Sequence, residues 1–134
     1  MRTLHLSGSG SDTLTITSDE EPEPLSWRVE LQAEGLKATT DIDLDAIRRT
    51  VEPIGEFFAS LAADWRGWAG KRNWGRRPIM LTATHDGLGH IGLIVELEET
   101  YDRWRVRGEL VLDAGRLDQV ARDATHLPAL LPEP

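Results

Sequence analysis

Short segments in which apolar and polar residues alternate run along most of the chain. In Thr13–Thr17, the apolar Leu14 and Ile16 alternate with threonines, which is the period-two pattern typical of a strand with one buried face. The same alternation predicts strands at residues 2–6, 25–33, 36–44, 79–86, 90–97 and 103–112. Because these strands have one polar face and short connecting turns, we expect a mostly antiparallel sheet of about six or seven strands.

One segment follows the helical period instead. Apolar residues recur at steps of three and four at Ile47, Val51, Ile54, Phe58, Leu61 and Trp65, and this spacing places them on one stripe of a helix. Pro53 lies within the stripe and has no backbone N–H to donate. We therefore expect a short turn at 45–51 with Asp45 as its N-cap, and a main helix from about Pro53 to Trp65 that ends at Gly67.

A second helix is predicted at residues 116–125, with Leu117, Val120, Ala121 and Ala124 facing inward. The resulting order of elements predicts an α+β domain in which the main helix and the C-terminal helix pack on one face of the sheet. We expect a single domain over residues 1–134, with N-terminal strands and an acidic loop in 1–24 and a proline-rich tail at 126–134.

Composition and charge exclude several classes of function. The 134 residues include no cysteine, which rules out disulfides, thiol catalysis and cysteine-ligated zinc. No apolar run is long enough to span a bilayer, and the N-terminus lacks the pattern of a signal peptide. With a net charge of −8, we expect a cytoplasmic protein that is not attracted as a whole to nucleic acid or to anionic lipid.

The segment His85-Asp86-Gly87-Leu88-Gly89-His90 is the first candidate for chemistry. If the four residues 86–89 form the loop, the two histidines stand directly opposite each other across a hairpin. His85, Asp86 and His90 are then candidate metal ligands, because imidazole binds zinc, copper and nickel. The other interpretation is a glycine-rich turn with hydrogen-bonded histidines, and a third firm ligand is not visible nearby.

The connection between residues 65 and 77 contains five basic residues, three tryptophans and no acidic residue. The candidate partner-binding residues are Trp65, Arg66, Trp68, Arg72, Trp74, Arg76 and Arg77. One interpretation is a helix-to-strand connection in which tryptophans cap the edge of the core and arginines stack on them. A second is a protein-contact patch, because tryptophan and arginine are enriched in interface hot spots. A third is binding of single-stranded nucleic acid, which the acidic remainder of the chain disfavours.

Arg103, Arg105 and Arg107 lie on one face of a predicted strand. Like charges in such a row repel one another unless acidic residues lie opposite them. Glu96 and Glu98 on the preceding strand are the expected cross-strand partners.

Two short patterns carry a resemblance to known families. Trp65-Arg66-Gly67-Trp68 together with His85-Asp86-Gly87-Leu88-Gly89-His90 resembles a small actinobacterial family of unknown function with a WRGW…HDGxGH pattern, over residues 25–125. More distantly, the order of elements is similar to that of the Wap-type immunity proteins, which pair with contact-delivered toxins. Gly89-His90 and Asp118-Gln119 are the matching positions, and neither resemblance implies catalytic residues.

These observations favour a non-enzymatic, cytoplasmic protein-binding domain, and the more distant resemblance implies an immunity protein that neutralises a toxin. The alternative hypothesis is a metal- or small-ligand-binding domain that uses the hairpin from His85 to His90. An enzyme is disfavoured because no motif pairs a nucleophile with a base. We expect a protein partner, no cofactor and no membrane association.

Overall fold

The computed structural model describes residues 2–8, 10–18, 26–43, 52–99 and 103–127. Its strands form two four-stranded antiparallel sheets, with the orders β1-β2-β3-β4 and β5-β6-β7-β8. The first sheet contains β1 (Arg2–Ser7), β2 (Thr13–Ser18), β3 (Ser26–Ala33) and β4 (Leu36–Asp43). The second contains β5 (Arg72–Arg76), β6 (Ile79–His85), β7 (His90–Glu98) and β8 (Arg105–Asp113). The predicted α+β class with antiparallel strands is confirmed, but the strands form two sheets rather than one sheet of six or seven.

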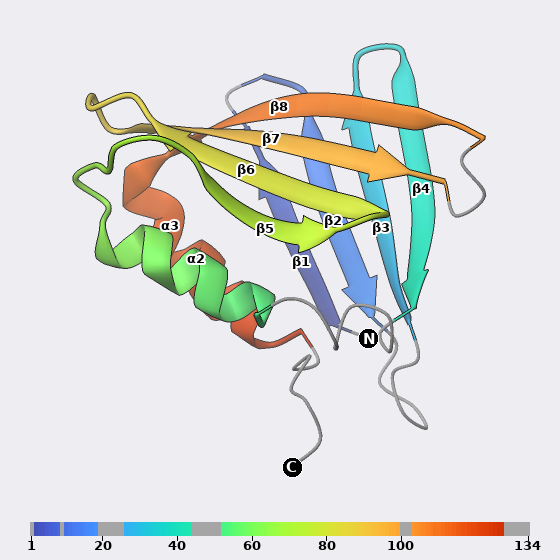
Figure 1. Cartoon of the computed structure of the whole chain (residues 1–134), viewed down its shortest axis with the longest axis horizontal. Helices are drawn as coiled ribbons and strands as arrows, with labels where there is room; N and C mark the ends of the chain where they lie inside the picture. The colour runs from blue at the N-terminus through green and yellow to red at the C-terminus, as the bar shows by residue number, and fades with distance from the viewer. Residues whose placement is uncertain (1, 9, 19–25, 44–51, 100–102, 128–134) are drawn as a thin grey trace.

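The strands of the second sheet run across those of the first, and the two helices lie together along one side of the molecule, beside β1 and below β5 in the view of Figure 1. They are α2 (Ile54–Ala63) and α3 (Leu117–Thr125), and the short 3₁₀ helix η1 (Ala114–Arg116) leads into α3. The two helices approach closely, since a Cβ added at Gly55 would lie 3.0 Å from Thr125 Cα. Within the described residues, no helix is long and apolar enough to cross a membrane.

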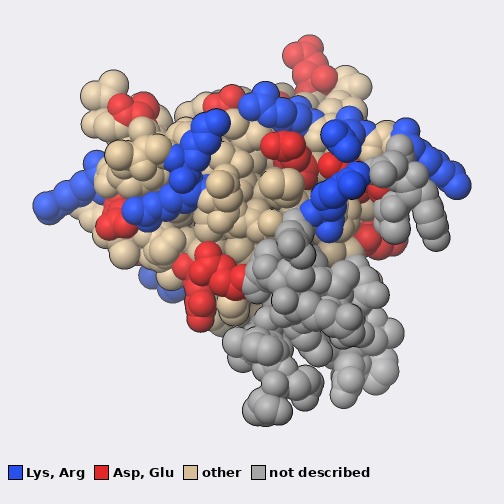
Figure 2. Space-filling view, in the orientation of Figure 1, with Lys and Arg blue, Asp and Glu red and all other residues tan. Residues whose placement is uncertain are grey.

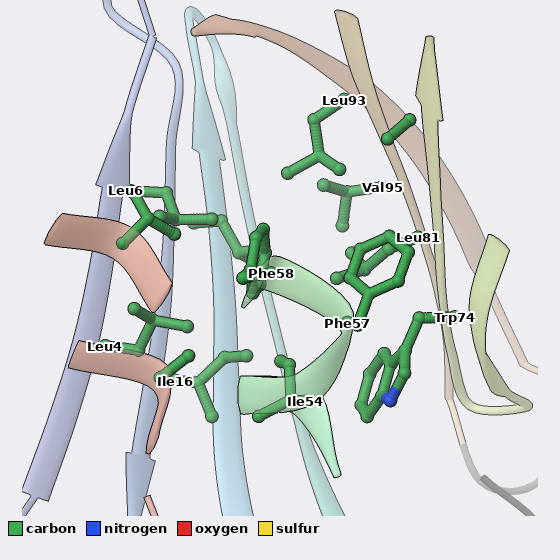
Figure 3. Close-up of a cluster of buried hydrophobic side chains, with 14 of the residues drawn as sticks. Leu4, Leu6, Ile16, Ile54, Phe57, Phe58, Trp74, Leu81, Leu93 and Val95 are labelled. Carbon is green, nitrogen blue, oxygen red and sulfur yellow. The ribbon is translucent and has the colours of Figure 1, made fainter. Parts of the chain in front are cut away.

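The core is one continuous cluster of buried side chains that joins both sheets through α2. Figure 3 shows Ile54, Phe57 and Phe58 of α2 in the space between the sheets. Around them lie Leu4, Leu6 and Ile16 from the first sheet and Trp74, Leu81, Leu93 and Val95 from the second. The main helix thus contacts the inner faces of two sheets, whereas the sequence predicted that it covers one face of a single sheet.

The main helix is shorter than the sequence predicts. It begins at Ile54, directly after Pro53, and it ends at Ala63. Trp65 therefore leaves the buried stripe, and 51% of its surface is exposed. The predicted turn at 45–51, with its N-cap Asp45, lies outside the described residues, and so do the acidic loop and the end of the proline-rich tail.

Strand β5 lies inside the connection between residues 65 and 77, where the sequence predicts no strand. Trp74 is its only large apolar residue, so the alternation that marks the other strands is absent there. The Trp74 ring is 3% exposed and stacks on Trp27, with ring centroids 6.2 Å apart. Its Nε1 donates to the Glu52 carbonyl oxygen over 2.7 Å. Trp74 is a core residue, and the prediction that it binds a partner is wrong.

Two arginines of the predicted row, Arg105 and Arg107, lie on β8, and Arg105 forms the predicted cross-strand ion pair. In the β7–β8 register, Glu98 faces Arg105 and Glu96 faces Arg107. Arg105 Nε lies 3.1 Å from Glu98 Oε1. Arg77, which follows β5, forms an ion pair with the other oxygen of the same carboxylate, so Glu98 joins two segments of the second sheet.

Candidate functional site

The two segments that the sequence singled out meet at one end of the molecule. There the loop after α2, the turn between β6 and β7, and the start of α3 lie close together (Figure 1). We call this region, made of residues 65–68, 85–90 and 111–118, the hairpin end. His85 Nε2 lies 2.8 Å from the Trp65 carbonyl oxygen, and the His85 ring packs edge-on against the Trp68 ring at 5.2 Å.

The register of the hairpin separates its two histidines. His85 pairs with Ile91, and the Asp86 N–H donates to the His90 carbonyl oxygen. The loop is therefore Gly87-Leu88-Gly89, one residue shorter than expected. Because neighbouring residues of a strand point to opposite faces, His85 lies on the inner face with Ala83, and His90 lies on the outer face. The expectation that the histidines face each other is wrong.

Asp86 organises the turn through both carboxylate oxygens. Oδ1 accepts the N–H of Leu88 at 2.6 Å and the N–H of His90 at 3.1 Å. Oδ2 lies 3.0 Å from His90 Nδ1. The bond from Leu88 and, after it, the bonds and charge of His90 lower the pKa of the Asp86 carboxyl below its usual value. Asp86 therefore holds the loop in place while it is ionised.

His85 uses both ring nitrogens in hydrogen bonds. Its Nδ1 accepts the Gly87 N–H at 2.8 Å, and its Nε2 contacts the Trp65 carbonyl oxygen, which can only accept. No lone pair of His85 is left for a metal unless one of these bonds breaks. Of the three metal candidates, the structure brings together Asp86 and His90. The described residues contain no group of three or more His, Cys, Asp or Glu that could hold a metal ion.

The basic, aromatic segment folds largely onto itself. The Arg72 guanidinium lies 4.8 Å from the centroid of the half-buried Trp68 ring, and it also donates to Asp64 Oδ2 at 2.6 Å. The Arg66 guanidinium lies 5.2 Å from the centroid of the exposed Trp65 ring. These contacts match the interpretation in which tryptophans cap the edge of the core and arginines stack on them.

The remaining basic candidates lie away from this end. Arg77 is paired with Glu98. Arg76 belongs to β5, and its side chain is outside the described part of the structure. Trp65 and Arg66 are thus the members of the predicted patch that present an exposed aromatic ring with a cation above it.

Two depressions flank η1 at the hairpin end. One, of about 450 Å³, is lined by Ser7, Gly8, Asp86, His90, Val111, Asp113 and Arg116. The other, of about 220 Å³, is lined by Ala62, Trp65, Ala114, Gly115, Leu117 and Asp118. In the view of Figure 2, the face of the molecule carries basic and acidic side chains interspersed, and the projecting turn between β6 and β7 shows acidic atoms beside uncharged ones.

Sequence reasoning did not single out several residues of this surface. Leu88, at the hairpin tip, is 81% exposed, and Val111 on β8 is 39% exposed. An apolar residue between two loop glycines was a usable signal for Leu88. The sequence singled out Asp118 only as a position of the distant resemblance, and Asp113 not at all, because the fold alone brings them beside a hairpin more than 20 residues earlier in the chain.

Comparison with known proteins gives a family but no activity. A family model described as a family of unknown function (DUF6228) matches residues 7–129. No curated protein and no solved structure matches the chain.

Proposed function

This chain belongs to that family of unknown function, and we propose that it is a non-enzymatic protein-binding domain whose contact surface is the hairpin end. One observation carries the proposal. Of the five large apolar residues that are exposed in the described structure, three lie at this end: Trp65, Leu88 and Val111. Val111 and Trp65 each line one of the two depressions, and exposed apolar groups that lie near one another are typical of protein interfaces.

The hairpin end is also held in a fixed shape before any partner arrives. Asp86 fixes the backbone on both sides of Leu88, and His85 ties the turn at Trp65 to Gly87. A surface ordered in this way loses little conformational entropy on binding, and so more of its contact energy is available for affinity.

Charge supports a basic partner. The chain carries −8 overall, and at the hairpin end the three exposed carboxylates of Asp86, Asp113 and Asp118 outnumber the two exposed guanidinium groups of Arg66 and Arg116. An acidic surface attracts a basic one and speeds their association. Together with the distant resemblance to Wap-type immunity proteins, this favours a cytoplasmic immunity protein that covers the basic surface of a toxin.

The test is binding to the products of the genes adjacent to its own, measured by titration calorimetry with purified proteins. We expect one of them to bind, and we expect Leu88→Asp and Trp65→Ala to weaken binding at least about tenfold, as for hot-spot residues. Leu36→Asp is the matched control, since Leu36 is also exposed (39%) but lies at the start of β4. The proposal fails if no adjacent product binds, or if all three variants bind like the parent.

An alternative function, binding of a small ligand or metal ion at the hairpin, rests on a separate observation. The Asp86–His90 pair lines the depression of about 450 Å³. Titration with zinc and nickel tests this alternative. Heat of binding that disappears in His90→Ala supports it, and heat that is absent or unchanged in that variant contradicts it.

A further inference from the structure

The smaller depression at the hairpin end is lined by apolar, aromatic and acidic side chains. Its apolar lining includes Ala62, Ala114 and Leu117, and the last two of these are buried in the core. The exposed side chains of Trp65 and Asp118 line the same depression. This set of groups differs from that of the larger depression, which is lined mainly by polar and charged side chains.

Asp118 has no partner within the described part of the chain: it accepts no hydrogen bond and forms no ion pair there. Arg122, one helical turn further along α3, is placed to pair with it. Arg122 instead donates to Gln119 Oε1 at 2.9 Å. As the first acidic residue of α3, Asp118 interacts favourably with the helix N-terminus, but that interaction leaves its carboxylate oxygens accessible.

Trp65 already shows that its ring accepts a cation. The Arg66 guanidinium lies 5.2 Å from the ring centroid, within the distance at which a cation and an aromatic face attract each other. Half of the Trp65 surface is still exposed. A basic side chain from outside can therefore meet the indole ring and the Asp118 carboxylate at one place.

We infer that this depression is a receptor for one lysine or arginine side chain of a protein partner. The aliphatic stem of such a side chain packs on Ala62 and Leu117 and against Trp65, and its charged head pairs with Asp118. Long basic side chains bury their stems on apolar surface in this way while the head stays at the water boundary. The net charge of −8 favours the same occupant. The inference rests on the proposed function, because it names the partner chemistry that the hairpin end recognises.

The experiment is a chemical-shift titration of the whole ¹⁵N-labelled chain at low ionic strength. The probe is a blocked tripeptide, acetyl-glycyl-lysyl-glycine amide, and the comparison is the norleucine analogue, which has the stem but no charge. We expect shifts confined to residues 62–66 and 114–118 with the lysyl peptide, and weaker binding in 0.5 M salt because salt screens an exposed ion pair.

Two variants test whether binding of the peptide depends on Asp118. Asp118→Asn should weaken binding of the lysyl peptide at least about threefold, which is the effect of losing one exposed charge pair. Glu34→Gln is the control, since it makes the same change in net charge at an exposed turn between β3 and β4, and it should bind like the parent. Equal shifts with the norleucine peptide, or equal affinity in Asp118→Asn, would overturn the inference.

Failure of this inference is distinguishable from failure of the proposed function. If the lysyl peptide binds in an Asp118-dependent manner but no adjacent gene product binds, the proposed function fails and the cation receptor stands. If a partner binds through Leu88 and Asp118→Asn alters neither partner nor peptide binding, the inference fails and the protein-binding function stands.

Discussion

The His85 imidazole ties the turn that carries Trp65 to the hairpin tip. Its Nε2 lies 2.8 Å from the Trp65 carbonyl oxygen, and its Nδ1 accepts the Gly87 N–H at 2.8 Å. One side chain thus joins two segments that are 20 residues apart, and both bonds require the neutral ring with its proton on Nε2. The exposed Trp65 and Leu88 are connected through this ring.

The first prediction concerns the protonation of the two hairpin histidines. His85 should carry its proton on Nε2, because a backbone N–H already points at Nδ1. His90 should carry a proton on Nδ1, which faces the Asp86 carboxylate at 3.0 Å. Long-range ¹H–¹⁵N correlation spectra at neutral pH distinguish these forms. A His85 ring protonated at Nδ1 would contradict the network.

A second prediction is that His85→Ala destabilises the fold. The variant loses two hydrogen bonds and leaves the Gly87 N–H without its acceptor, so the free energy of unfolding should fall by about 1–2 kcal/mol. His5→Ala is the control, since His5 is exposed and, among the described residues, bonds only the Thr15 hydroxyl, and its effect should stay within about 0.5 kcal/mol. Urea unfolding measures both, and equal losses would argue against the bridging role.

The third prediction follows from the lowered pKa of Asp86. A carboxyl whose pKa is lower in the folded state stabilises the fold above its unfolded pKa, about 3.9, and this contribution is lost as the pH falls through the folded value. Thermal unfolding of the parent and of Asp86→Asn should show the parent melting higher near neutral pH. The two melting curves should converge at acidic pH, and a difference that persists there would refute the assignment.

A fourth prediction separates two tryptophans that lie nine positions apart. Trp74→Ala should lower the free energy of unfolding by about 3–5 kcal/mol, because it empties a core site and removes the bond to the Glu52 carbonyl. Trp65→Ala should lower it by less than about 1 kcal/mol, since its ring contacts chiefly solvent and Arg66. Comparable losses in the two variants would mean that Trp65 is not a surface residue.

The fifth prediction tests the contact between the helices. Alanine is better than glycine in a helix by about 1 kcal/mol, yet a Cβ at Gly55 would lie 3.0 Å from Thr125 Cα and 2.8 Å from Thr125 Oγ1. Since backbone must move, we expect Gly55→Ala to destabilise the fold by about 1–2 kcal/mol net. Gly10→Ala, with open space around it, is the control, and a stabilising Gly55→Ala would show that α2 and α3 can separate at little cost.

Much of the secondary structure follows from the sequence because its signal is local. The alternation in Leu14 and Ile16, and in the strands that became β6 and β7, is written into consecutive residues and survives in the fold. β5 was not predicted, because Trp74 is its only large apolar residue and the segment therefore shows no alternation. Its place in the sheet depends on pairing with β6 and on the contact between Trp74 and Trp27. The alternation pattern of a short segment does not report either of these contacts.

The candidate site, too, was predicted only in part from the sequence. The sequence identified Trp65, Arg66 and the His85–His90 segment as candidate binding residues. It predicted a hairpin loop one residue too long, and this wrong length placed the two histidines face to face. A shift of one residue moves a side chain to the other side of a sheet, and that shift was set by the bonds from Leu88 and His90 to Asp86.

By itself, the sequence determined the α+β class, the antiparallel pairing and most strand positions, because backbone periodicity and turn chemistry act between near neighbours. Tertiary structure decided that there are two sheets, that Trp74 is buried while Trp65 is exposed, and that the hairpin and the start of α3 form one surface. Those outcomes depend on which residues far apart in the chain pack together in the core. The free energy gained by burying their apolar surface comes from contacts between segments, so no single segment contains it.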